Sequence, residues 1–440
     1  MAALFCLGML LYYLVVFRRG RDGASVLAKL LWAVYFALGL SALFIALTDV
    51  LRPVLEPNYL SALFLLACVL VSISGFLRFR PHHVSEAVRV VPGQGLIEAV
   101  LICSQLLAIL FFLPFAYSSF TGDAGENRLE LASKIELLGS YGLLNTAAGA
   151  ASQLFGVSLV MGLIRLSQPR LTQAALLRAL LLVGASLSYV IYILAYVGRD
   201  GVVYWLMTAL MVCLVFRPRL SRRARSHILV GGAVVGALLM VPMAAITIAR
   251  FVDSEFGSAW SVLDYFGSQI NNFSDYSSID RPLTYGVGNF PMFISGACSL
   301  AGIDCPAWGD IREIVFGQYL SQAKEPWLFG TFISDFVGDF GHAATLAILV
   351  VYAALCRRAC MPRRFTLQRL LLVLFMFLVP YWGVFFFRFS IVNGFIIVNL
   401  AFIFFVYLLH RINPMFARAA AHARSQRGTV LPAPQRNVLE

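Results

Sequence analysis

The stretch TFISDFVGDFGHAATLAILVVY, residues 331–352, decides the fold, because a polar segment becomes an apolar run within it. Residues 343–356 are apolar but too few to cross a bilayer alone, since a hydrocarbon core of ~30 Å needs ~20 residues of helix. A helix that crosses here therefore begins earlier and carries Asp335, Asp339 and His342 at the edge of the membrane. Their offsets of i, i+4 and i+7 place all three side chains on one helical face.

The rest of the chain has the composition of a protein whose solvent is lipid. Of its 440 residues, 60% are hydrophobic and 13% are charged, and the mean hydropathy is +0.82. These values exclude an ordinary soluble domain. We predict an all-α, polytopic integral membrane protein with eleven transmembrane helices and one large outer loop. The predicted spans are residues 2–17, 26–48, 59–77, 97–119, 143–164, 174–196, 201–216, 228–249, 337–356, 367–387 and 389–410.

The positive charges indicate the orientation of these spans. If the amino terminus lies outside, the inner side holds 25 of the 34 Lys and Arg residues. The acidic residues divide the other way, with 4 inside and 18 outside. Because cytoplasmic loops carry the excess of Lys and Arg, we predict an outer amino terminus and a cytoplasmic carboxyl terminus. The net charge of +12 is then anchoring charge, so we expect the lipid bilayer as a partner and no nucleic acid.

This orientation divides the chain into four parts. Residues 1–249 form a transmembrane bundle of eight spans, residues 250–336 a large outer loop with short interfacial helices, residues 337–411 a second bundle of three spans, and residues 412–440 a basic cytoplasmic tail. The uncharged run Val287–Ile303 would invert the sides of all later segments if it crossed, so we interpret it as a re-entrant or interface segment. Long loops in compact proteins are commonly functional. The first four spans carry little chemistry, so we expect the functional groups in and beside this loop.

The ionisable residues at the end of the loop have two interpretations. Acidic side chains favour helix amino termini, which explains Asp335 and Asp339 without any function. Ionisable groups at membrane depth are costly and commonly face a cavity. That interpretation also accounts for His342, the one outer-side histidine among six. We favour the functional interpretation, in which a carboxylate acts as a general base.

Among the arginines on the outer side in this topology, four are candidate ligand-binding residues: Arg199, Arg250, Arg281 and Arg388. The planar guanidinium binds phosphate oxygens in pairs without a metal ion, so we expect these side chains to bind a diphosphate. Two of them have plainer alternatives. Arg199 lies in a glycine-flanked tip that could be a solvated turn, and Arg388 is a lone charge between apolar spans that could snorkel to the interface.

Cysteine and histidine spacing gives little further chemistry. No metal-ligand spacing pattern and no cofactor motif is present, so we expect neither a metal nor a cofactor. Cys298 and Cys305 both fall in the outer loop, where an oxidising compartment would allow them to pair. Spacing alone leaves that pairing open.

Several of these segments together resemble a known family. They are the tip at Gly198-Arg199, the large outer loop that opens near Arg250, the segment SIDRPLTYGVGNFPMF (Ser278–Phe293) and, most of all, GTFISDFVGDFGHAATL at residues 330–346. In these segments, over residues 198–350, and in the span count of the whole chain, the sequence resembles the bacterial oligosaccharide repeat-unit polymerases (O-antigen polymerase, Wzy-type).

The resemblance implies a membrane glycosyltransferase with a GT-C-like fold in the bacterial inner (cytoplasmic) membrane. Such an enzyme would join undecaprenyl-diphosphate-linked oligosaccharide repeat units into a surface polysaccharide, such as the O-antigen of lipopolysaccharide, at the periplasmic face. It would need no metal and would invert the anomeric centre. By position, the four arginines would hold the diphosphates, Asp339 or, as the second choice, Asp335 would be the base, and His342 would orient a phosphate. A separate chain-length regulator would be a partner.

Three alternatives stay open. The related ligase, which moves finished polymer to the lipid A core, would have the same layout and similar chemistry. A flippase or other transporter for lipid-linked oligosaccharides would place charges at the bilayer midplane, in broken helices at paired positions. A sensor or structural membrane protein would not need the arginines and the carboxylates for polysaccharide synthesis.

Overall fold

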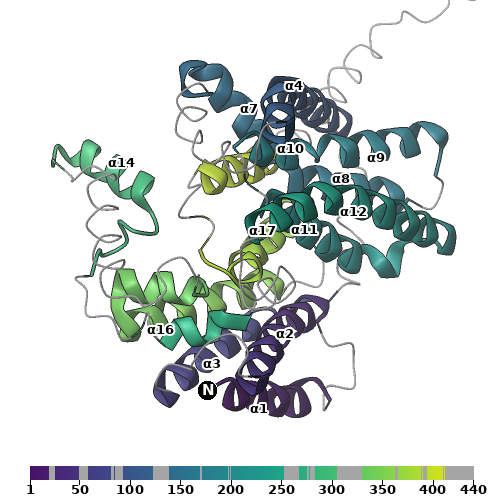
Figure 1. The fold of residues 1–440 in the computed structure, drawn as a ribbon. Coiled ribbons are helices and arrows are strands. Elements are labelled where there is room, and N and C mark those ends of the chain that lie inside the picture. The colour runs from purple at the N-terminus through teal and green to yellow at the C-terminus, as the bar shows by residue number, and fades with distance from the viewer. Residues whose placement is uncertain are drawn as a thin grey trace, which may run out of the picture.

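The computed structural model is built from helices, and the part of the chain that it describes contains no strand (Figure 1). The described residues are 1–18, 25–48, 58–80, 84, 93–121, 138–168, 171–196, 198, 200–251, 267–274, 277, 283–304, 330–361, 365–387, 389, 394–409 and 411.

A helix occupies each of the eleven predicted spans. In chain order these helices are α1 (Ala2–Tyr12) with its π-helical end η1 (Tyr13–Phe17), α2 (Val26–Thr48), α3 (Tyr59–Ser74), α4 (Gln94–Thr121), α7 (Leu143–Gln153) with α8 (Phe155–Leu166), α9 (Gln173–Ala185) with α10 (Ser188–Ala195), α11 (Asp200–Phe216), α12 (Arg222–Phe251), α16 (Phe332–Cys360), α17 (Leu367–Trp382) and the helix Gly394–Leu409.

Length and composition qualify six of these helices to cross a bilayer, or up to seven if α7 and α8, bent by 41° at Leu154, form one span. The all-helical prediction is therefore confirmed for the described residues, and the chain has the helices of a multi-pass membrane protein. The number of eleven crossings stays a prediction.

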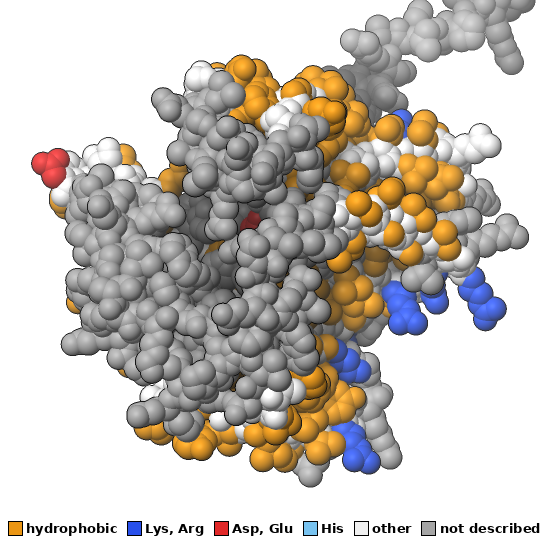
Figure 2. Space-filling model, in the orientation of Figure 1, with side chains coloured by type: hydrophobic (Ala, Val, Ile, Leu, Met, Phe, Trp, Pro, Cys, Tyr) orange, Lys and Arg blue, Asp and Glu red, His pale blue; other side chains and the backbone are white. Residues whose placement is uncertain are grey.

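The outer surface of the helices is apolar. Large hydrophobic side chains are widely exposed, and the most exposed include Leu60 and Leu143, at 78% and 85%. Figure 2 shows such side chains over much of the described surface, while most of the Lys and Arg side chains in view gather along one side. Soluble monomers rarely expose contiguous apolar areas of this extent, so lipid is the natural solvent of this surface.

The helices form two groups that α17 joins. Helices α1, α2 and α3 pack on one another and α16 packs on α3, whereas α4 packs with α7 to α10 and α11 packs on α8 and α10 (Figure 1). α17 contacts α2 and α16 of the first group and α11 of the second, and α11 also contacts α2. At the carboxyl-terminal end of α17, Trp382 packs against aromatic rings from α8, α10, α11, the segment after α17 and the helix Gly394–Leu409: Phe155, Tyr189, Tyr204, Phe389 and Phe395.

A proline within α17 leaves one backbone carbonyl without its helical hydrogen bond, and a neighbouring helix supplies the donor. Pro380 has no N–H, so the carbonyl of Met376, four residues earlier, loses its helical donor. The hydroxyl of Tyr352 in α16 donates a hydrogen bond to that carbonyl. The carbonyl of Pro380 itself accepts a hydrogen bond of 3.0 Å from the buried Tyr35 hydroxyl in α2. In lipid a freed backbone group needs such a partner, so these two bonds hold α17 against both neighbours.

A buried ion pair joins α4 to α8. Arg165 donates from Nε and Nη2 to the two carboxylate oxygens of Glu98, at 2.7 and 2.9 Å, and Gln94 donates to the same carboxylate at 2.9 Å. Glu98 is 2% exposed and Arg165 is 9% exposed. Further along the same two helices, Ser158 donates to Gln105 at 2.8 Å. The expectation that the first four spans carry little chemistry therefore overlooked a structural ionic contact in the fourth.

Arg165→Met should lower stability strongly, because it leaves the Glu98 carboxylate buried without its counter-charge. Breaking one partner of a buried pair costs ~3–5 kcal/mol. We expect a clearly lower apparent Tm of the purified protein in detergent, and partial recovery in the double variant Glu98→Gln/Arg165→Met. The matched control is Arg178→Met, since Arg178 is an exposed arginine of α9. Equal melting of the two single variants would show that the ion pair does not stabilise the fold.

Candidate functional site

The described parts of the predicted outer loop contact the helices at two places. Its segment 267–274 includes Phe273, which is fully buried and stacks on Phe64 of α3 with the ring centroids 6.3 Å apart. Just beyond it, the hydroxyl oxygens of Ser277 and Ser61 are 2.8 Å apart. The second place is the turn Thr284–Asn289, which precedes α14 (Pro291–Ala301) and packs on the first turns of α16.

Asp339 of α16 binds this turn through its carboxylate. Oδ1 accepts hydrogen bonds from the Thr284 hydroxyl and from the Gly288 N–H, the latter at 3.0 Å. Oδ2 accepts a hydrogen bond from the Asn289 N–H at 2.8 Å. The Asp339 side chain is buried, with the residue 2% exposed. Successive backbone N–H groups that converge on one anion form a concave binding site, and here the carboxylate occupies it.

Glycine is required in the turn for two different reasons. Gly286 has φ +97°, a conformation that L-residues with a side chain rarely adopt. At Gly288 the constraint is space, because an added Cβ would lie 2.6 Å from Oδ1 of Asp339. Tyr285 also has a positive φ, of 50°, and its N–H donates at 2.9 Å to the backbone carbonyl of Asp339. The turn is therefore shaped around Asp339 through both its side chain and its backbone.

Asp335, one helical turn earlier, connects α16 to the segment that follows α17. Its Oδ2 accepts a hydrogen bond of 2.6 Å from the N–H of Phe387. Its backbone carbonyl accepts a bond of 3.0 Å from the side-chain amide of Asn289, so the turn also reaches this residue. Asp335 is half-buried.

Three aromatic rings hold these segments together on their apolar side. The ring of Phe290, which follows the turn, lies 6.1 Å from that of Phe336 and 5.4 Å from that of Phe387. Phe336 and Phe387 are 5.0 Å apart, nearly perpendicular. These contacts therefore bring together the turn, the start of α16 and the segment that follows α17.

His342 does not share the helical face of the two aspartates. Gly341 has φ 75° and ψ 170°, far from helical values, so α16 is kinked between Asp339 and His342. The prediction of one face for all three side chains is wrong, because the i+7 relation holds only along an uninterrupted helix. The exposed His342 ring instead lies 4.9 Å from the Phe64 ring, edge to face.

Most of the predicted diphosphate-binding arginines fall outside the described residues. This holds for Arg199, Arg281 and Arg388, while Arg250 lies near the end of α12 with its side chain not described. Two of them are close in the chain to the contacts above. Arg388 follows Phe387 directly, and Arg281 precedes Thr284 by three residues. Consecutive Cα atoms are ~3.8 Å apart, so the two aspartates bind backbone at most a few residues from these arginines.

The loop beyond the turn carries an exposed apolar helix. α14 has no buried residue, and it lies apart from the other helices in Figure 1. Cys298 in this helix is disulfide-bonded, whereas Cys305 lies outside the described residues. An exposed, uncharged helix is consistent with the predicted interface segment at Val287–Ile303, which no crossing helix occupies.

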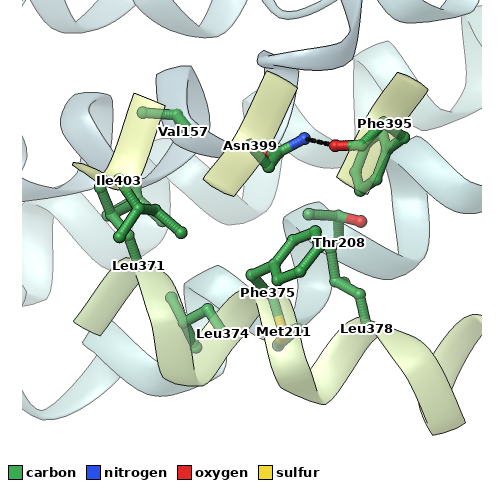
Figure 3. Close-up of a pocket in the computed structure, with 12 residues that line it drawn as sticks. Val157, Thr208, Met211, Leu371, Leu374, Phe375, Leu378, Phe395, Asn399 and Ile403 are labelled. Carbon is green, nitrogen blue, oxygen red and sulfur yellow. Dashed lines mark hydrogen bonds between the residues drawn. The ribbon is translucent and has the colours of Figure 1, made fainter. Parts of the chain in front are cut away.

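A cavity lies away from these groups, between α8, α11, α17 and the helix Gly394–Leu409. Its lining is apolar apart from Thr208 and Asn399, and Asn399 donates hydrogen bonds to the carbonyls of Phe395 and Gln153 (Figure 3). Its volume of about 30 Å³ can hold a water molecule or two. A cavity of this size is too small for a lipid chain.

The residues that donate hydrogen bonds to Asp339 were not identified from the sequence. Thr284, Gly288 and Asn289 lie within TYGVGN, a pair of glycines followed by asparagine inside an uncharged run. Such a pattern predicts a turn. The backbone N–H groups of a turn can bind an anion, so the turn together with the two aspartates could have indicated the contact. Among the described residues, no three His, Cys, Asp or Glu side chains form a group that could hold a metal ion.

The fold and the site define a class: a multi-pass helical membrane protein whose large loop is bound by two aspartates at the start of one helix. Comparisons with protein-family models, with curated proteins and with solved structures found no match.

Gly341→Ala should destabilise the protein, because alanine strains the backbone at φ 75° and ψ 170° although space is available beside Leu283. A non-glycine residue in this region costs ~1–3 kcal/mol. We expect a lower apparent Tm in detergent. Gly231→Ala is the control: Gly231 lies within α12 with nothing near its added Cβ, so that variant should melt at or above the wild-type temperature. A Gly341→Ala protein as stable as the control would contradict the kink.

Proposed function

We propose that the protein is a membrane glycosyltransferase that polymerises undecaprenyl-diphosphate-linked oligosaccharide repeat units at the periplasmic face of a bacterial inner membrane. The observation that carries the proposal is the convergence of two aspartates on backbone that adjoins two arginines in the sequence. The resemblance of residues 198–350 to Wzy-type polymerases and the asymmetric distribution of charge support the same conclusion.

The proposed reaction needs groups of this kind. A hydroxyl of the acceptor sugar attacks the anomeric carbon of the donor, the bond from that carbon to the diphosphate breaks, and polyprenyl diphosphate leaves. A carboxylate takes the hydroxyl proton as the new glycosidic bond forms. Arg199, Arg250, Arg281 and Arg388 bind the diphosphates and stabilise the charge that develops on the leaving group. Arginine supplies this charge without a metal ion.

The described contacts favour Asp335 over Asp339 as the base. Both oxygens of Asp339 already accept hydrogen bonds, and its side chain is buried. Asp335 is half-buried, so it is more accessible than Asp339. A general base must reach the hydroxyl proton directly or through one water, which burial hinders. His342 is exposed beyond the kink and does not share the helical face of the two aspartates, so it can contact a phosphate of the acceptor.

The ligase alternative shares this chemistry and differs in its acceptor, so it is separated by products. In the proposed role, the growing chain is the donor, one lipid-linked repeat is the acceptor, and a separate chain-length regulator limits the product. A flippase would move the same lipid-linked substrate without forming a bond.

Deletion of the protein in its source bacterium should leave surface lipid that carries a single repeat and no longer chains, as read from glycan gels. Loss of every attached repeat would instead indicate the ligase, and loss of repeats from the periplasm would indicate the flippase. Arg250→Ala, Asp335→Asn and Asp339→Ala should each reproduce the single-repeat pattern. The acidic control is Asp304→Asn, an exposed residue beyond α14, which should give normal ladders. Normal ladders from well-expressed Arg250→Ala and Asp335→Asn would refute the proposed active site.

A further inference from the structure

We propose that Asp339 is a positioning residue: its buried charge shapes the turn Thr284–Asn289, and the turn, which follows Arg281 in the chain by three residues, supports Asp335 for binding of a lipid diphosphate. The inference rests on the proposed function for its substrate and for the roles of Arg281 and Asp335. It gives Asp339 a role different from that of a base, and it assigns roles to Thr284, Gly288 and Asn289.

The turn binds the Asp339 carboxylate through hydrogen bonds. Three donors reach its two oxygens, and two of these donors are consecutive backbone N–H groups. A buried carboxylate is stable only when hydrogen bonds replace the water it has lost. The turn supplies those bonds, so the charge and the turn conformation depend on each other.

The turn is connected to two proposed site residues, to one through the chain and to the other through a hydrogen bond. Towards its amino-terminal end the chain reaches Arg281 within three residues of Thr284. Towards its carboxyl-terminal end, the Asn289 side chain donates to the backbone carbonyl of Asp335, the proposed base. A displacement of the turn would therefore loosen the support of the proposed base and shift the anchored backbone that lies closest in the chain to Arg281. Misplacement of binding groups by ~1 Å can cost ~100-fold in rate.

The chain permits a steric test that leaves every charge in place. A Cβ on Gly288 would meet Oδ1 of Asp339 at 2.6 Å and Oγ1 of Thr284 at 3.2 Å. Gly296, eight residues further on in α14, has nothing within 4 Å of its added Cβ. Gly288→Ala and Gly296→Ala therefore each add one methyl group. The methyl group at 288 meets the Asp339 carboxylate, and the methyl group at 296 has no neighbour within 4 Å.

The experiment compares these variants in the full-length protein reconstituted in proteoliposomes. We expect Gly288→Ala to raise the apparent KM for the undecaprenyl-diphosphate-linked repeat by at least about tenfold, with a smaller change in kcat. Gly296→Ala should match the wild type. Thr284→Val, which removes one donor at constant shape, should give a smaller rise in KM and serves as the second variant if Gly288→Ala fails to fold. Unchanged KM in both Gly288→Ala and Thr284→Val would overturn the inference.

Asp339→Asn separates positioning from catalysis. A positioning role predicts a raised KM and a pH–rate profile that keeps its acidic limb, because the titrating base is still present. Loss of that limb, together with a normal KM in Gly288→Ala, would make Asp339 the base and refute the inference.

Hydrogen–deuterium exchange tests the turn without reference to any activity. Amides in a peptide that spans residues 284–290 should exchange slowly in the wild type and at least about tenfold faster in Asp339→Asn. If the wild type forms no polymer but this difference is seen, the proposed function fails and the positioning of the turn stands. If the wild type elongates chains but exchange is the same in both proteins, the function stands and the inference is overturned.

Discussion

A carboxylate buried among apolar helices needs hydrogen-bond donors, and the contacts around the start of α16 meet that requirement. Asp339 is 2% exposed, and the backbone N–H groups of the turn take the place of solvent around its carboxylate. The turn needs glycine where it approaches the carboxylate, and α16 needs glycine where it bends away afterwards. The turn and the buried charge therefore depend on each other.

The same rule explains polar contacts elsewhere in the bundle. Glu98 is balanced by Arg165, and the carbonyl released by Pro380 in α17 is satisfied by Tyr352. These contacts join helices and involve no exposed group, so they stabilise the scaffold. The Asp339 contact differs because its partner is the loop that we predict to lie on the outer side, where a lipid-linked substrate would arrive in the proposed orientation.

The helices could be predicted from sequence because long apolar runs are a strong signal, and a helix lies at each predicted position. The kink at Gly341 could not, since a single glycine within a helical pattern is compatible with both a straight and a bent helix. The partners of Glu98 and Asp339 were also missed. Arg165 lies 67 residues from Glu98, and Asn289 lies 50 residues from Asp339, so these pairings depend on tertiary packing that no local pattern encodes. Asp335 and Asp339 were themselves predicted as site residues, whereas Glu98 was not.

We propose that the start of α16 binds backbone close in the chain to Arg281 and Arg388, so that both arginines can bind a lipid diphosphate. The most direct measurement is an electron cryo-microscopy map of the protein in lipid nanodiscs with geranyl diphosphate, a short polyprenyl diphosphate. The account predicts diphosphate density beside the start of α16, between the turn Thr284–Asn289 and the segment at Phe387, contacted by arginine side chains. A map in which Arg281 and Arg388 lie in separate environments, with no diphosphate near Asp335, would contradict it.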